Sequence, residues 1–161
     1  MRALSTIAML VVVAAVAVLG TTDRAAAVDG RLTVQSLALN VGEEGSVVLH
    51  AGEISEPGVG TWTLDVTYDP NLLILTDCVP EEHSVCVPDL APDTVRITGA
   101  TAVGLYPDVT LALFTFRCQA IGVSPLTIGV EIWTDAGAPP PPPSVEVEDG
   151  SVTCVAPGAD A

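Results

Sequence analysis

The chain has 161 residues, 49% of them hydrophobic and 4% aromatic, and its formal net charge at pH 7 is −15. Lysine is absent and arginine is rare, so few groups could release counterions from a phosphate backbone or an anionic membrane surface. This balance argues against a nucleic-acid partner and favours an acidic domain with one core.

The segment 1–27 has the pattern of a secretory signal peptide. A positively charged start is followed by an almost unbroken apolar run over residues 7–19 and by three alanines that end at Ala27. A membrane anchor is the alternative, but the run is short for a bilayer span. We expect cleavage after Ala27, no membrane attachment afterwards, a secreted domain over residues 28–155 and a flexible tail over 156–161.

From Arg31 onward the chain has the pattern of short β-strands and no convincing helix. The clearest strand lies at the start of residues 60–75, where large apolar side chains alternate with polar ones. The inward row is Trp62, Leu64, Val66 and Tyr68, and the outward row is Thr61, Thr63 and Asp65. The Asp69-Pro70-Asn71 turn follows, because proline fixes its own φ and biases the preceding residue away from helix.

Glycine and proline separate the other predicted strands. These strands cover residues 32–35, 46–51, 72–78, 94–98, 109–118, 126–133 and 144–154. Residues 79–92 are expected to form a loop and residues 99–108 a crossing segment, and the proline run 139–143 should form a polyproline II loop. About nine short strands divided by turns predict an all-β sandwich.

Four cysteines in an exported chain predict two disulfides, with three pairings to choose from. Cys78 and Cys86 bracket a short loop, so a local bridge is the economical pairing. Cys118 and Cys154 would then close a longer loop by elimination. A metal site is the competing interpretation, but no C-x-x-C spacing occurs and an oxidising compartment disfavours it.

The sequence lacks the residue constellations of common enzymes. Its only histidines, His50 and His83, are far apart, and no G-x-S-x-G motif occurs. Acidic residues are so frequent that some pair will approach by chance. We therefore predict no catalytic residue, no metal ligand and no cofactor.

The string T-W-T-L-D-V-T-Y-D-P-N-L-L-I-L resembles the segment of cohesin modules that precedes and follows their Y-D-P turn. The resemblance continues in order through four further blocks and covers residues 31–155. These blocks are T-V-R-I-T-G-A-T-A-V-G-L, V-T-L-A-L-F-T-F, S-P-L-T-I and V-E-D-G-S-V-T.

This resemblance implies a nine-stranded jelly-roll sandwich without catalysis. It also implies attachment to a dockerin-type protein in an extracellular, polysaccharide-degrading assembly, with the calcium of the pair held by the dockerin. In cohesins the binding sheet includes the strand before the Y-D-P turn. The partner-binding residues implied on that sheet are Thr61, Thr63, Asp65, Arg96, Thr98 and Glu131.

Two other functions stay open on the sequence. A carbohydrate-binding module on the same fold would bind polysaccharide through exposed aromatic side chains, for which Trp133 and Tyr106 are the candidates. A stalk or envelope domain would need no ligand. The outward Asp65 could instead be a solvated carboxylate, and Arg96 could pair with a local acid rather than with a partner.

Overall fold

The computed structural model describes residues 30–81, 83–136 and 145–158, and all regular elements in them are strands. The predicted signal peptide, the proline run 139–143 and the last three residues lie outside the described residues. The strands are β1 (Arg31–Val34), β2 (Leu37–Asn40), β3 (Glu44–Gly52), β4 (Val59–Thr67), β5 (Leu73–Pro80), β6 (Ser84–Ala91), β7 (Thr94–Leu105), β8 (Val109–Cys118), β9 (Gly122–Asp135), β10 (Glu146–Glu148) and β11 (Gly150–Val155).

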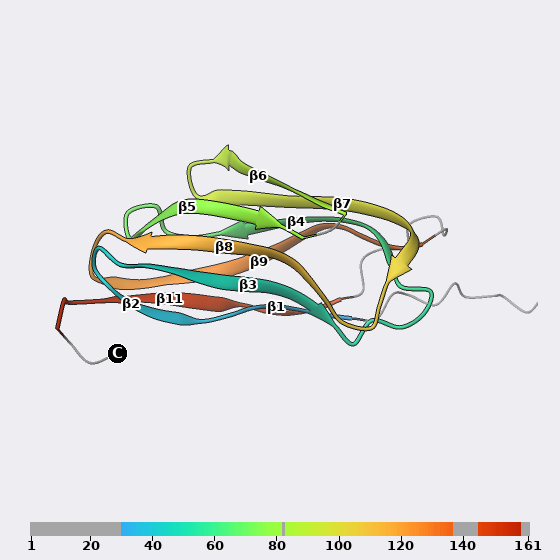
Figure 1. The fold of residues 1–161 in the computed structure, drawn as a ribbon, viewed down its shortest axis with the longest axis horizontal. Helices are drawn as coiled ribbons and strands as arrows, with labels where there is room; N and C mark the ends of the chain where they lie inside the picture. The colour runs from blue at the N-terminus through green and yellow to red at the C-terminus, as the bar shows by residue number, and fades with distance from the viewer. Residues whose placement is uncertain (1–29, 82, 137–144, 159–161) are drawn as a thin grey trace, which may run out of the picture.

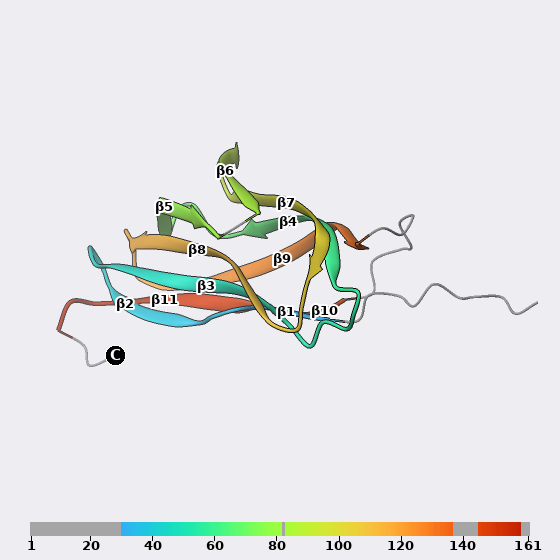
Figure 2. The same cartoon turned by 45° about the vertical axis from the view of Figure 1, so that its right-hand side comes forward.

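The strands form two sheets that pack face to face along the long axis of the molecule (Figures 1 and 2). One sheet has five strands in the order β10-β1-β3-β8-β5, and the other has six in the order β2-β11-β9-β4-β7-β6. The chain passes from the first sheet to the second between β1 and β2 and closes one side of the sandwich. The predicted all-β jelly-roll sandwich is confirmed.

The core follows from the alternation of apolar side chains. Trp62, Leu64 and Val66 of β4 are each 0% exposed. Phe114 and Phe116 of β8, in the other sheet, are also 0% exposed and belong to the same core cluster. Burial of such side chains contributes roughly 1.5–3 kcal/mol each, which makes this two-sided layer the main stabilising element. The predicted inward row of β4 is therefore confirmed.

Tyr68, just after β4, is only half-buried. Its ring meets the ring of Phe116 edge to face, with 5.2 Å between the centroids. This arrangement suits the charge distribution of aromatic rings. Tyr68 therefore packs at the margin of the core.

Gly99 of β7 is required by the size of the Trp62 ring. A Cβ atom at Gly99 would lie 2.2 Å from Cζ2 of Trp62 and 2.4 Å from the carbonyl oxygen of His83. Neither neighbour is free to move, because the indole is buried and the oxygen belongs to the backbone. A side chain at this position would push the Trp62 ring out of its place in the core.

Two predicted connections are wrong. Residues 79–92 do not form one loop, since β5 continues to Pro80 and residues 84–91 form β6. Residues 99–108 are not a crossing segment, because β7 continues to Leu105. Prolines suggested a loop at β6, but β6 is an edge strand, where a missing backbone N–H is tolerated. These differences and the division of the terminal strands give eleven strands in the described residues instead of about nine.

Both predicted disulfides are confirmed, and each joins the two sheets. Cys78 of β5 bonds to Cys86 of β6, and Cys118 of β8 bonds to Cys154 of β11. The second bridge lies in the core, where both cysteines are 1% exposed. The sandwich is therefore cross-linked at two separate places.

The described residues offer no membrane-spanning helix, since none of them forms a helix of the length and apolarity that a bilayer requires.

Candidate protein-binding face

The outer surface of the six-stranded sheet contains all six predicted partner-binding residues. Thr61, Thr63 and Asp65 are in β4, Arg96 and Thr98 are in the adjacent β7, and Glu131 is in β9 on the other side of β4. We call the outer surface of β6, β7, β4 and β9 the β4 face. The structure thus brings the six residues into one sheet.

One row across the β4 face has hydroxyl groups at its centre and apolar side chains at its ends. The strand register aligns Thr98 with Val85 on one side and Thr63 on the other, and aligns Thr63 with Ile132. Thr98 donates a hydrogen bond to the carbonyl oxygen of Trp62, and its oxygen lies 3.2 Å from the hydroxyl of Thr63. The two threonines are therefore held in fixed orientations.

The neighbouring row is centred on an ion pair. Arg96 donates from Nε and Nη2 to the two carboxylate oxygens of Asp65, and both distances are 2.7 Å. Val87 of β6 and Gly129 of β9 continue this row on either side. The two-pronged geometry fixes both side chains, because the planar guanidinium matches the carboxylate.

The environment of Arg96 keeps it charged. The hydrogen bonding that Arg96 donates to Asp65 raises the pKa of the Arg96 guanidinium, desolvation opposes this effect, and the charges of Asp65 and Glu131 add to the increase. The local pairing proposed for Arg96 from the sequence is confirmed. The centre of the β4 face is therefore an internally balanced pair of charges.

Glu131 and Ile132 reach the surface side by side because β9 contains a bulge. The register shifts between the pairs Thr63–Ile132 and Leu64–Val130, which leaves Glu131 unpaired with β4. A bulge puts two residues of one strand opposite one of its partner, so strict alternation is lost there. As a result Glu131 is exposed and Ile132 is 43% exposed.

Sequence reasoning missed the apolar part of the β4 face. Val85 is 57% exposed, Val87 is 38% exposed, and both lie on β6. They alternate with Ser84 and Cys86, a period-two signal that the loop prediction for this segment concealed. With Ile132, they place apolar surface on both sides of the polar centre.

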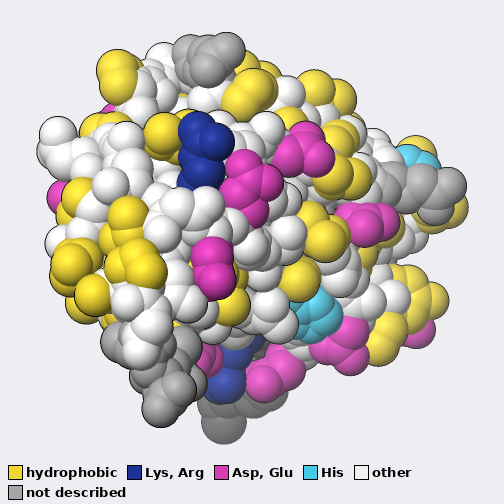
Figure 3. All heavy atoms as spheres, turned by 60° about the vertical axis from the view of Figure 1, so that its left-hand side comes forward, with side chains coloured by type: hydrophobic (Ala, Val, Ile, Leu, Met, Phe, Trp, Pro, Cys, Tyr) yellow, Lys and Arg dark blue, Asp and Glu magenta, His cyan; other side chains and the backbone are white. Residues whose placement is uncertain are grey.

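Two of the three arginines in the described residues lie beside acidic side chains. Figure 3 shows one side of the molecule, on which magenta acidic side chains are spread among yellow apolar ones and the dark-blue basic groups have acidic neighbours. Arg31 lies 3.1 Å from Glu146 and 3.8 Å from Glu53. Arg31 and Arg96 therefore each have an acidic partner within the domain.

The aromatic side chains do not form a sugar-binding strip. The expected exposure of Trp133 is wrong, since this residue is 1% exposed, whereas Tyr106 is 50% exposed as predicted. Trp133 lies opposite the buried Trp62 in the β4–β9 register, which explains its burial. Stacking on sugar rings would therefore depend on Tyr106 alone.

The described residues contain no cluster of three or more His, Cys, Asp or Glu side chains arranged to hold a metal ion. His50 lies beside Asp108, with 3.9 Å between Nε2 and Oδ1, and His83 is in the turn before β6. The two histidines do not share a site.

No protein-family model and no curated protein sequence matches the chain. Its structure, however, is similar to those of cohesins. The seventh ScaB type I cohesin from Pseudobacteroides cellulosolvens has a TM-score of 0.71 at 16% identity over 82% of this chain and 96% of that cohesin. The chain has the cohesin fold.

Two further cohesin structures are also similar to the structure of this chain. The third ScaC cohesin of Acetivibrio cellulolyticus, solved in complex with the ScaB dockerin, has a TM-score of 0.70 at 14% identity over 79% of this chain and 99% of that one. A non-cellulosomal cohesin from the archaeon Archaeoglobus fulgidus has a TM-score of 0.68 at 18% identity over 81% and 94%. The cohesin fold therefore occurs with a dockerin partner and also outside cellulosomes.

Proposed function

We propose that this chain is a secreted, non-catalytic cohesin-like module that binds a dockerin-type protein through the β4 face. The single observation that carries the proposal is the composition of that face on a cohesin fold. A fixed polar centre, made by Asp65, Arg96, Thr63 and Thr98, has exposed apolar side chains on both sides.

Such a surface suits binding to another protein. Protein interfaces combine a few well-packed apolar anchors with polar groups that set the register and exclude wrong partners. On the β4 face the anchors are Val85, Val87 and Ile132. The Asp65–Arg96 pair and the two threonines supply the polar groups, and their mutual hydrogen bonds reduce the cost of ordering them when a partner arrives.

The disulfides and the N-terminal sequence both support the proposal that the protein is secreted. Two formed disulfides are typical of an oxidising compartment. The apolar run over residues 7–19 supplies the export signal. The intact mass of the protein recovered from the medium of an expressing bacterium tests this part, and we expect a chain that begins at Val28.

Calorimetric titration of the mature domain with a panel of calcium-loaded dockerins tests the binding proposal. We expect at least one dockerin to bind with measurable heat. Ile132→Asp should weaken that binding by tenfold or more, because it puts a charge in place of an apolar anchor, and the loss of an interface hot spot costs about 2 kcal/mol or more. The matched control is Ile121→Asp, since Ile121 is 66% exposed and lies in the turn between β8 and β9.

The pair of isoleucine variants separates the β4 face from a general effect of added charge. Equal weakening by both variants would place the binding site elsewhere or indicate long-range repulsion. The absence of heat with every dockerin, including those from the same genome, would rule out the dockerin partner. Retardation of the domain by soluble glucans or xylans, abolished by Tyr106→Ala, would instead favour a sugar ligand.

A further inference from the structure

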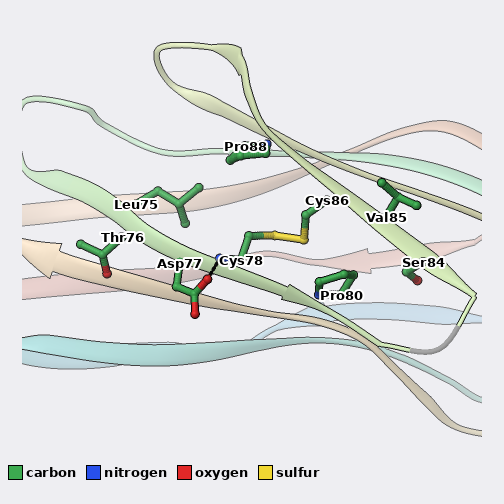
Figure 4. Close-up of a pocket in the computed structure, with 9 residues that line it drawn as sticks. All are labelled: Leu75, Thr76, Asp77, Cys78, Pro80, Ser84, Val85, Cys86 and Pro88. Atoms are coloured by element: carbon green, nitrogen blue, oxygen red, sulfur yellow. Dashed lines mark hydrogen bonds between the residues drawn. A yellow bond between two sulfur atoms is a disulfide. The ribbon is translucent and has the colours of Figure 1, made fainter.

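The Cys78–Cys86 disulfide connects the two outermost strands on the same side of the sandwich. Cys78 is in β5, the last strand of the five-stranded sheet, and Cys86 is in β6, the last strand of the six-stranded sheet. Figure 4 shows the bridge crossing the space between these two strands. The chain itself passes between the sheets on this side through residues 81–83, and the bridge adds a second covalent link there.

The bridge is accessible from solvent. It lies in an open groove of about 500 Å³ between β5 and β6 that Leu75, Asp77, Pro80 and Val85 also line. Cys78 and Cys86 are both partly exposed, whereas Cys118 and Cys154 are each 1% exposed. A reductant can therefore approach the first disulfide in the folded protein but not the second.

Apart from the short connections at its two ends, β6 has few interactions that fix its position, and the bridge is one of them. In the described residues it has a hydrogen-bonded ladder with β7 only, in which four successive pairs from Ser84 to Val87 are followed by an irregularity before Ala91. No ladder joins β6 to β5 in those residues. Pro88 cannot donate a backbone hydrogen bond, which weakens the strand further.

The same short strand supplies part of the β4 face. Cys86 points inward, opposite the buried Ile97, and its neighbours Val85 and Val87 point outward beside Thr98 and Arg96. Any loosening of Cys86 therefore displaces two of the three apolar anchors. The bridge and the binding residues are coupled through adjacent positions of one strand.

We propose that the Cys78–Cys86 disulfide is a selectively reducible brace that holds β6 in the β4 face, so that its reduction weakens partner binding while the sandwich stays folded. This inference rests on the proposed function for the binding effect alone. Its structural part, a selectively reducible bridge that orders β6, stands without any partner.

The reaction is a thiol–disulfide exchange with an external dithiol. A thiolate of the reductant attacks one of the two sulfurs, a mixed disulfide forms, and the other cysteine leaves as a thiolate that takes up a proton. The second thiol of the reductant then attacks the mixed disulfide. The protein gains two thiols, and the reductant loses two hydrogens and becomes a cyclic or intramolecular disulfide.

Graded reduction with dithiothreitol under native conditions tests the structural part. The thiols are trapped with an alkylating agent and assigned by peptide mapping. We expect Cys78 and Cys86 to be labelled at least about tenfold faster than Cys118 and Cys154, since exchange rates follow access. Labelling of all four cysteines together, in step with global unfolding, would overturn the proposal.

Hydrogen exchange on the selectively reduced protein shows whether β6 is released. Amide protection should fall in residues 84–91 and persist in β3, β4, β8 and β9. Unchanged protection in residues 84–91 would show that the bridge does not hold this strand, and would contradict the proposal irrespective of any partner.

The binding effect is measured on the same material with a dockerin that binds the oxidised domain. Reduction, or the variant Cys78→Ala/Cys86→Ala, should weaken binding about tenfold, because the strand that carries two anchors must be ordered again when the partner binds. Equal affinity of both forms would contradict the coupling. If no dockerin binds the oxidised form, the proposed function fails, while the labelling and exchange results still decide the structural part.

Discussion

Asp65 and Arg96 lie directly opposite each other on β4 and β7 and share two hydrogen bonds of 2.7 Å. Their side chains are 16% and 32% exposed, so the pair is at the surface but partly covered. Arg96 and Asp65 thus form charge-assisted hydrogen bonds with each other in the free domain. A partner therefore meets a balanced dipole at the centre of the β4 face instead of an isolated charge.

This pairing predicts non-additive effects on stability. Asp65→Asn should lower the melting temperature, because the guanidinium loses its charged acceptor. Arg96→Gln should do the same, but the double variant should be less destabilised than the sum of the two, since neither charge is then left alone. Thermal unfolding of the unchanged protein, the two single variants and the double variant gives the interaction energy as a double-mutant cycle. Strict additivity would show that the two groups do not interact in solution.

Trp62 is expected to stabilise the fold through its volume and not through hydrogen bonding. It is 0% exposed, and its indole Nε1 has no hydrogen-bond partner among the residues that the structure describes. Trp62→Ala should cost about 3–5 kcal/mol of unfolding free energy because of the cavity it leaves. Trp62→Phe should cost clearly less, because it keeps most of the ring and buries no unpaired N–H group.

Urea unfolding of the two Trp62 variants gives the comparison. Equal destabilisation by phenylalanine and alanine would contradict the expectation that the volume of the Trp62 side chain is what stabilises the fold. Trp133→Ala serves as a second test of the same kind, since the Nε1 of Trp133 is also buried and has no partner in the described part of the chain.

The two disulfides should differ in their contribution to stability. Cys118 and Cys154 are separated by 36 positions and Cys78 and Cys86 by 8. The chain-entropy model gives about 4 kcal/mol for the longer loop and about 2.5 kcal/mol for the shorter one. Urea unfolding of the two double alanine variants measures the difference. A greater loss for the Cys78–Cys86 variant would contradict the expected order.

Asp135 predicts a specific pH dependence. Burial at the end of β9 raises the pKa of its carboxyl above the ordinary value of 3.8. Because the folded-state pKa is the higher one, the contribution of this group to stability is full below the unfolded pKa and is lost as the pH rises through the folded pKa. Asp135→Asn should therefore raise the melting temperature at pH 7, and the gain should shrink towards pH 3.

The exposed Glu131 provides the control for this experiment. Glu131→Gln should show no comparable gain at pH 7, since its carboxyl is in solvent. A melting-temperature difference for Asp135→Asn that stays constant from pH 3 to pH 7 would mean that desolvation does not govern this group.

The sequence was sufficient where a local pattern determined the structure. Period-two alternation identified the inward row of β4, and loop length favoured the pairing of Cys78 with Cys86. Register between distant strands has no such local signal. The contact between Asp65 and Arg96 depends on how β4 and β7 align, and the sequence alone offered only the pairing of Arg96 with an unidentified acid, as one of two possibilities.

The missed part of the β4 face has two physical causes. Prolines and cysteines in residues 79–92 indicated a loop, although an edge strand tolerates them, and so Val85 and Val87 were overlooked. The bulge at Glu131 breaks alternation in β9, and with it Ile132 moves to the surface. Trp133 was misplaced for a related reason, because its position near the predicted end of a strand suggested exposure.

Pro80 and Pro88 affect how copies of the domain can associate through their exposed strand edges. Each stands in one of the two strands that border the groove, β5 and β6, and neither has an N–H group to offer to a strand of another molecule. Open strand edges otherwise invite neighbouring copies to add on and grow into aggregates. On this side of the sandwich, the two edges are therefore poor templates for edge-to-edge joining when copies of the domain are held close together.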